Sequence, residues 1–315
     1  MTTLYLVVPC YNEEAVLPET ARRLGEKLDA LQAAGKISGM SRILLVDDGS
    51  RDKTWALIEG FAAADERFGG VKLTRNRGHQ NALLAGLATA HAQRCDAVIS
   101  LDADLQDDVD AIDRMVESYE AGHDVVYGVR AARTTDTAFK RATAHGFYRL
   151  MAALGVELVY DHADYRLLSF RALDGLLQFG EVNLFLRGIV PQVGYPSDTV
   201  MYERAERFAG ESKYPLKKML AFALEGITSF SVRPVRMVAA VGGAVFIVSL
   251  LALLGLLIAR LCGAGVTGLA LAVASLWTLG GLQLFGIGVV GEYVGRVYQE
   301  TKHRPRFLIE RTLLR

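Results

Sequence analysis

The chain has 315 residues, and its 35 basic and 35 acidic side chains give a formal net charge of zero. That balance argues against nucleic-acid binding through an overall positive charge, so only local basic patches need to be considered. The hydrophobic fraction is 51%, and the excess is concentrated towards the C-terminus. The cysteines, Cys10, Cys95 and Cys262, are few and widely spaced, which argues against a disulfide framework or a CxxC metal site and fits a reducing cytosol.

Short apolar runs alternate with helical patterns through the first hundred residues. The predicted strands cover residues 4–8, 43–47, 71–74 and 97–101. The helical patterns between them cover residues 13–34, 52–65 and 79–93. Fully apolar strands that alternate with helices predict a parallel sheet covered on both faces, which is a doubly wound α/β domain. Ligands of such sheets bind beyond the carboxyl ends of the strands.

Polar residues follow each predicted strand and are therefore expected to gather at one edge of the sheet. The four segments are Pro9 to Glu13, Asp47 to Ser50, Arg75 to Gly78 and Asp102 to Asp104. In the last of them, two carboxylates follow an apolar strand, which is unfavourable unless a cation lies beside them. Carboxylate oxygens suit Mg²⁺ or Mn²⁺. We therefore expect Asp102 and Asp104 to be metal ligands, with Gln106 adding a neutral oxygen or positioning a water.

Two long apolar segments lie near the C-terminus. Neither segment contains a charged residue, and their bounds are Val238 to Ala259 and Leu269 to Gly291. Each is long enough to cross about 30 Å of hydrocarbon, so we predict a two-helix transmembrane hairpin, with a pair of buried core helices as the alternative. Arginine and lysine flank the hairpin on both outer sides, which places the N-terminal domain and the tail in the cytoplasm.

The segment before the hairpin mixes Leu, Phe and Met with basic residues. We interpret residues 214–237 as one or two amphipathic helices lying in the membrane interface, with a soluble packing helix as the alternative. The predicted organisation is a catalytic domain at 1–213, amphipathic helices at 214–237, the hairpin at 238–291 and a cytoplasmic tail at 292–315.

A series of motifs resembles family 2 glycosyltransferases. In chain order they are VVPCYNEE, LLVDDGSRDKT, LTRNRGHQNALLAGLATA, LDADLQDD, YGVR, DYRLLSFRAL, NLFLRGIV and ERFAGESKY. More narrowly, the chain is similar over essentially its whole length to polyprenyl-phosphate glycosyltransferases, which include dolichol-phosphate mannose synthases. Its later stretches are most similar to the bactoprenol glucosyltransferase branch. The resemblance implies a GT-A fold, a nucleotide-sugar donor, Mg²⁺ or Mn²⁺, and inversion at the anomeric carbon.

The resemblance also implies a set of donor-binding residues. Tyr11 would stack in the first loop, and Asp47 and Asp48 would accept hydrogen bonds from a nucleobase, with helix capping by one of the two left open. Arg207 and Lys213 would close over the donor diphosphate. The full nucleotide-sugar set is Pro9, Tyr11, Asn12, Glu13, Asp47, Asp48, Asn76, Gly78, Asp102, Ala103, Asp104, Gln106, Arg207 and Lys213.

A second set belongs to the acceptor. The resemblance places Arg130 and Arg141 beside the acceptor phosphate, with Lys140 as the alternative to Arg141 in that role. It offers Asp164 as a catalytic base or an acceptor-site residue, which makes Asp104, Asp164 and Arg130 the expected catalytic set. A phosphate monoester has a second pKa near ~6 and is already an anionic nucleophile at neutral pH, so a strong base is hardly required.

The expected reaction is one in-line displacement that transfers glucose from UDP-glucose to undecaprenyl phosphate at the bacterial inner membrane. Mannose, N-acetylhexosamine and aminoarabinose donors remain open, and the resemblance suggests a homotetramer. A nicotinamide oxidoreductase is disfavoured because no GxGxxG follows the first strand. A processive synthase is disfavoured because Trp occurs only at 55 and 277, outside a QxxRW motif. A non-enzymatic scaffold or a lipid-linked sugar flippase component is the alternative from another class.

Overall fold

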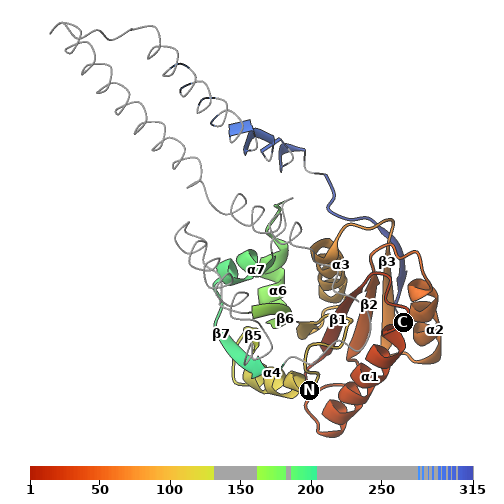
Figure 1. Ribbon diagram of the computed structural model, residues 1–315. Coiled ribbons are helices and arrows are strands. Elements are labelled where there is room, and N and C mark those ends of the chain that lie inside the picture. The colour runs from red at the N-terminus through yellow and green to blue at the C-terminus, as the bar shows by residue number, and fades with distance from the viewer. Residues whose placement is uncertain are drawn as a thin grey trace, which may run out of the picture.

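The computed structural model describes residues 1–130, 162–181, 186–203 and 304–314, together with scattered positions between 276 and 302. Within these residues eight strands form one mixed sheet, with helices on both faces (Figure 1). The strands are β1 (Leu4–Cys10), β2 (Arg42–Asp47), β3 (Phe68–Leu73), β4 (Ala97–Ser100), β5 (Val125–Arg130), β6 (His162–Ser169), β7 (Ser197–Tyr202) and β8 (Ile309–Leu313). The helices are α1 (Leu17–Ala33), α2 (Thr54–Ala64), α3 (His79–Ala92), α4 (Ala111–Glu120), α6 (Phe170–Leu177), α7 (Leu186–Ile189) and the 3₁₀ turn η1 (Val190–Val193).

The strand order is β7-β5-β6-β4-β1-β2-β3-β8. The first four strands pair in parallel, which confirms the parallel α/β core predicted from the alternating pattern. Beyond β4 the sheet departs from that pattern, because β6 pairs antiparallel with both β4 and β5. The sheet as a whole is therefore mixed, with four parallel and three antiparallel strand pairings among the described strands.

Alternation along β1 divides the interior into two layers. Leu4, Leu6 and Val8 belong to the core beneath α1, α2 and α4. Tyr5 and Val7 belong to the core beneath α3 and α6 on the opposite face. Successive side chains of a strand point to opposite faces, so a strand covered on both sides has to be apolar throughout. This arrangement leaves the strand ends as the place where polar side chains collect.

The last strand closes the far edge of the sheet. β8 pairs antiparallel with β3, and the two lie side by side in Figure 1. Lys72 Nζ lies 2.9 Å from Glu310 Oε1, and Arg311 donates to Glu59 of α2 at 2.7 Å. The sequence analysis placed a tail at 292–315 and did not predict this strand.

The predicted amphipathic segment 214–237 lies outside the described residues, as does nearly all of the predicted hairpin at 238–291. Among the positions that are described, no helix has both the length and the apolar character needed to cross a bilayer.

Gly86 in α3 sets how closely that helix packs on the sheet. A Cβ at this position would lie 2.4 Å from Val7 Cγ1 and 2.7 Å from Val46 Cγ2. We expect Gly86→Ala to lower the free energy of unfolding by about 1–3 kcal/mol through overpacking. Gly60 in α2 is the matched control, since a Cβ there meets nothing within 4 Å, and Gly60→Ala should raise stability by up to about 1 kcal/mol. Thermal melting of both variants measures the difference, and equal shifts would contradict the packing argument.

Candidate active site

The loops after β1 and β2 are tied to each other at the carboxyl edge of the sheet. The Asn12 side-chain oxygen accepts the backbone N–H of Arg51 at 2.9 Å, and the Asn12 N–H donates to Ser50 Oγ at 3.0 Å. Asn12 has a positive φ of 53°, a conformation that asparagine tolerates better than most residues. The Glu13 N–H donates to Thr54 Oγ1 at 2.9 Å, which joins the first loop to the start of α2.

Asp48 ties the loop after β2 to the loop after β3. Its two carboxylate oxygens accept the backbone N–H groups of Arg77 at 2.7 Å and Gly78 at 2.9 Å. Gly49 makes this approach possible, because a Cβ there would lie 2.6 Å from the backbone of Arg75 and Asn76. Gly78 has a φ of 86°, so its backbone conformation, rather than crowding by neighbouring atoms, explains the glycine.

Asp47 and Asp48 are both buried where β2 ends. Asp47 is fully buried and accepts the Ser50 N–H at 3.0 Å. Burial raises the pKa of both carboxyl groups above their ordinary value. Neither caps α2, because the Thr54 N–H at the start of that helix donates to Asp52 instead. In this structure the visible role of Asp48 is to shape the loops.

The acidic loop, residues 102–108, follows β4 and is held from both sides. On one side, Thr20 Oγ1 of α1 donates to the Ala103 carbonyl oxygen at 2.8 Å. On the other side, Tyr165 of β6 donates to the Asp108 carbonyl oxygen at 2.9 Å, and Tyr202 of β7 donates to Asp107 Oδ1 at 2.6 Å. These contacts fix the position of the loop beside the sheet.

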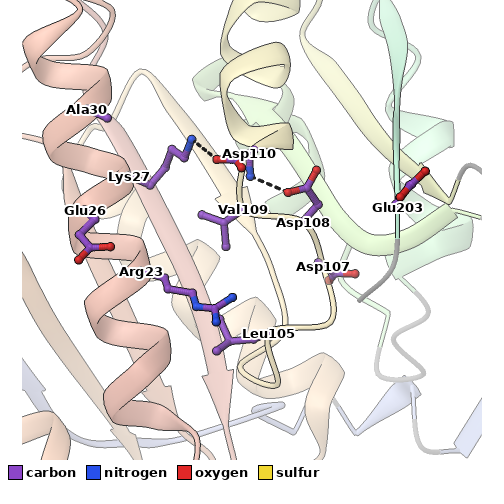
Figure 2. Close-up of a pocket in the computed structure, with 10 residues that line it drawn as sticks. All are labelled: Arg23, Glu26, Lys27, Ala30, Leu105, Asp107, Asp108, Val109, Asp110 and Glu203. Atoms are coloured by element: carbon purple, nitrogen blue, oxygen red, sulfur yellow. Dashed lines mark hydrogen bonds and ion pairs between the residues drawn. The ribbon is translucent and has the colours of Figure 1, made fainter. Parts of the chain in front are cut away.

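Figure 2 shows the cavity of about 650 Å³ between α1 and the acidic loop. Lys27 reaches across it from α1 and donates to Asp110 and Asp113, each at 2.6 Å. Leu105 lines the same cavity and has a positive φ of 56°, which is strained for a leucine and is held there by the surrounding contacts.

The acidic loop carries concentrated negative charge. Burial and, after it, the charge of Asp102 raise the pKa of Asp107 to about 6. Asp102 Oδ1 lies 3.5 Å from His79 Nε2, so the first residue of α3 faces the acidic loop. Burial would lower the pKa of His79, but the carboxylates of Asp164 and Asp102 outweigh burial and raise it to about 9.

Asp164 lies at the centre of a buried charge cluster. Arg166 donates to its Oδ1 atom at 2.5 Å, and Arg187 donates to Oδ2 at 3.1 Å and to Oδ1 at 3.3 Å. His79 Nε2 lies 3.6 Å from Oδ2. Burial alone would raise the pKa of Asp164, but the Arg187 guanidinium, the His79 imidazole and the Arg166 guanidinium together hold it well below its ordinary value.

The contacts of Asp164 bear on whether it acts as a base. Its side chain pairs with Arg166 and Arg187, and His79 links it to Asp102 (3.5 and 3.6 Å). A carboxylate with so low a pKa is a weak proton acceptor. The arrangement therefore favours an organising role for Asp164 over the role of general base.

Arg130 lies at the end of β5, opposite Tyr202 in the register of β7, and its Nε donates to the Tyr202 hydroxyl at 3.4 Å. Asn76 Oδ1 accepts the Gly78 N–H at 3.2 Å, and the Gln106 N–H donates to Asp104 Oδ1 at 3.2 Å. Pro9 lies within β1, and Tyr11 follows it. The remaining predicted residues, Lys140, Arg141, Arg207 and Lys213, lie outside the described residues.

The structure adds three residues that the sequence analysis gave no firm role. His79 was expected to line the site through its loop but was given no partner, Arg187 appeared only as part of the NLFLRGIV motif, and Tyr202 was given no role. The signal available for Arg187 was a lone basic residue inside an apolar segment, which needs a buried partner. Nothing in the spacing of Tyr202 indicated its contact with Asp107.

Asp102, Asp104 and Gln106 offer two carboxylates and one amide at the end of β4. Mg²⁺ is commonly bound through one or two carboxylates, with substrate phosphates and waters in the remaining positions, and this donor set fits that pattern. Within the described ranges, no group of three or more His, Cys, Asp or Glu side chains is arranged to hold a metal without such a substrate.

One family model and relatives of nearly full length identify the family. Residues 5–177 match the family described as glycosyl transferase family 2. The glycosyltransferase YkoT of Bacillus subtilis is 52% identical over 98% of this chain and 91% of its own length. The bactoprenol glucosyl transferase of Shigella phage SfV is 40% identical over 97% of each chain. Among solved structures, glucosyl-3-phosphoglycerate synthase from Mycobacterium tuberculosis in complex with phosphoglyceric acid aligns with 72% of this chain and 78% of its own, at 21% identity and a TM-score of 0.45.

The buried cluster predicts a large stability effect at Asp164. Asp164→Asn removes the charge that compensates fully buried Arg166, and it should lower the free energy of unfolding by about 3 kcal/mol or more. Glu19 is the matched control, because it also pairs with two arginines, Arg22 and Arg23, but on the solvent side of α1. Glu19→Gln should change stability far less. Chemical denaturation measures both, and similar losses would contradict the buried-charge interpretation.

Proposed function

The chain belongs to glycosyl transferase family 2, and we propose that it transfers glucose from UDP-glucose to a membrane polyprenyl phosphate, with inversion at the anomeric carbon. The observation that carries this proposal is the near full-length similarity to bactoprenol glucosyl transferases. The arrangement of the site supports it, since Arg130 lies near Asp107 of the acidic loop, and Arg166 and Arg187 pair with Asp164. Such a site suits a reaction that brings two anionic phosphates together.

The donor is proposed to lie across the carboxyl ends of β1, β2 and β4, where Tyr11, Asn12 and Glu13 wall the nucleoside. Asp102, Asp104 and Gln106 would hold Mg²⁺ or Mn²⁺. When bound, the cation would neutralise charge on the leaving nucleoside diphosphate. Arg207 and Lys213 are proposed to close over the same diphosphate.

The acceptor phosphate is proposed to bind at Arg130, with Arg141 or Lys140 beside it. A guanidinium binds phosphate through two parallel hydrogen bonds and so orients it. The phosphate is already anionic at neutral pH and attacks the anomeric carbon without transferring a proton to the enzyme. Asp164 then serves to hold Arg187 and His79 in place, and the rate depends on positioning and charge compensation.

We also propose that residues 238–291 anchor the protein in the bacterial inner membrane, with the catalytic domain in the cytoplasm. The two segments without charged residues support this. So do the exposed apolar side chains at the end of the second segment and just beyond it, since Val290, Val294, Val297 and Tyr298 are 52–61% exposed. Apolar surface of this kind fits contact with lipid or with another helix. Assembly into a homo-oligomer remains a prediction that rests on the resemblance to the bactoprenol glucosyltransferase branch.

Two alternatives concern the chemistry. A donor that carries mannose, N-acetylhexosamine or aminoarabinose in place of glucose would use the same site. Selection among these sugars depends on contacts to their hydroxyl groups, and the described loops do not define those contacts. A non-enzymatic scaffold or flippase component would not need the charge cluster around Asp164, which has a high desolvation cost. The buried cluster therefore favours the enzyme.

The direct test is a transfer assay with the purified full-length protein. Radiolabelled UDP-glucose, GDP-mannose, UDP-N-acetylglucosamine and a UDP-aminoarabinose derivative are each offered with undecaprenyl phosphate, in Mg²⁺ and in EDTA. We expect label in the lipid fraction from UDP-glucose, and loss of transfer in EDTA because the leaving diphosphate is no longer neutralised. Transfer from another donor would correct the sugar, and no transfer from any donor would contradict the proposed function.

Asp104→Ala tests the metal assignment. Removal of one of two carboxylate ligands should lower turnover by at least about 100-fold while the protein stays folded. Asp110→Ala is the control, because Asp110 is also acidic and lies just beyond the acidic loop, but its side chain is 84% exposed and bonds to Lys27. It should keep nearly full activity. Unchanged turnover in Asp104→Ala would remove Asp104 from the metal site.

A further inference from the structure

Tyr202 bridges two parts of the site that come from different strands. The side chain is 1% exposed at the end of β7. Its hydroxyl donates to Asp107 Oδ1 at 2.6 Å and accepts a hydrogen bond from Arg130 Nε at 3.4 Å. One oxygen atom thus joins the acidic loop to the arginine proposed to bind the acceptor phosphate.

Asp107 depends on this contact. It is 6% exposed, and its Oδ2 atom has no hydrogen-bond partner within the described part of the chain. A buried carboxylate is stabilised by each hydrogen bond that it accepts, so Asp107 keeps the Tyr202 hydroxyl directed at its Oδ1 atom. The bond to Asp107 therefore fixes the oxygen atom that Arg130 contacts.

Arg130 gains a fixed orientation from the same hydroxyl. The contact uses Nε, so it does not occupy the two terminal guanidinium nitrogens. Terminal nitrogens suit bidentate phosphate binding. Arg130 and Tyr202 are also register partners of the parallel pair β5 and β7, which sets the distance between their backbones.

We infer that Tyr202 is a positioning residue, whose hydroxyl aligns the Arg130 guanidinium with the acidic loop so that the acceptor phosphate is held in line with the sugar donor. The inference rests on the proposed function, because it takes Arg130 as the ligand of the acceptor phosphate. Alignment of two substrates contributes strongly to the rate, and a displacement of about 1 Å can cost up to about 100-fold.

Tyr165 provides a matched control for the substitution. Its ring packs edge-on against that of Tyr202, with centroids 5.2 Å apart at 82°. It is equally buried, and its hydroxyl donates to the same acidic loop, at the Asp108 carbonyl oxygen. Tyr165→Phe therefore removes one buried hydrogen bond from the loop without touching Arg130.

The experiment is a double-mutant cycle on full-length protein with undecaprenyl phosphate as the varied substrate. Tyr202→Phe should lower kcat/KM for the lipid about tenfold, and Tyr165→Phe should lower it less than about twofold. In an Arg130→Lys background, which lacks the Nε donor, Tyr202→Phe should have an effect of less than about twofold. The dissociation constant of UDP, measured by calorimetry, should change less than about twofold in each tyrosine variant.

Three results would overturn the inference. An equal effect of Tyr202→Phe in the wild-type and Arg130→Lys backgrounds would show that the two residues act independently. If Tyr165→Phe lowered kcat/KM as much as Tyr202→Phe, Tyr202 would act only by supporting the acidic loop. The same conclusion would follow if Tyr202→Phe weakened UDP binding by the same factor as it lowered kcat/KM. Wild-type protein that transfers no sugar to polyprenyl phosphate would instead contradict the proposed function and remove the premise with it.

Discussion

Opposite charges buried together at the carboxyl edge of the sheet are the constraint on which the site depends. Burying Arg166 is costly unless an anion accepts its hydrogen bonds. Asp164 is that anion, because its Oδ1 atom accepts a hydrogen bond from the Arg166 guanidinium at 2.5 Å. Asp164 in turn fixes Arg187 and faces His79, which reaches the acidic loop at Asp102. A single chain of charges therefore runs from β6 to the end of β4.

The acidic loop gains its fixed shape from the elements around it. α1 holds it through Thr20, whereas β6 and β7 hold it through the hydroxyls of Tyr165 and Tyr202. Carboxylates held in place before the substrate arrives need no reorganisation during the reaction, which is the main advantage of a preorganised site. The donor and acceptor halves of the proposed reaction thus share one rigid support.

The sequence predicted the parts of this molecule that follow from local pattern. Four apolar strands and three helices were found within a few residues, because strands buried on both faces have to be apolar. Strand order beyond β4 was not predictable in this way, since the antiparallel insertion of β6 depends on contacts distant in the chain. The residues at the strand ends were identified by type, and Arg166 was considered as a partner of Asp164, but the burial of Asp47 and the contacts of Asp164 with Arg187 and His79 were not predicted. Sequence spacing records neither depth nor contact, and for the same reason His79 and Tyr202 gained their roles only from the structure.

The pairing of β8 with β3 has a consequence for how the protein folds while it is synthesised. Lys72 and its partner Glu310 are separated by 238 positions, so the edge of β3 stays open while the ribosome adds everything between them. An open strand edge is a template for mispairing during synthesis. The nascent chain therefore has to shield that edge, or reach its last residues quickly, before the sheet is complete.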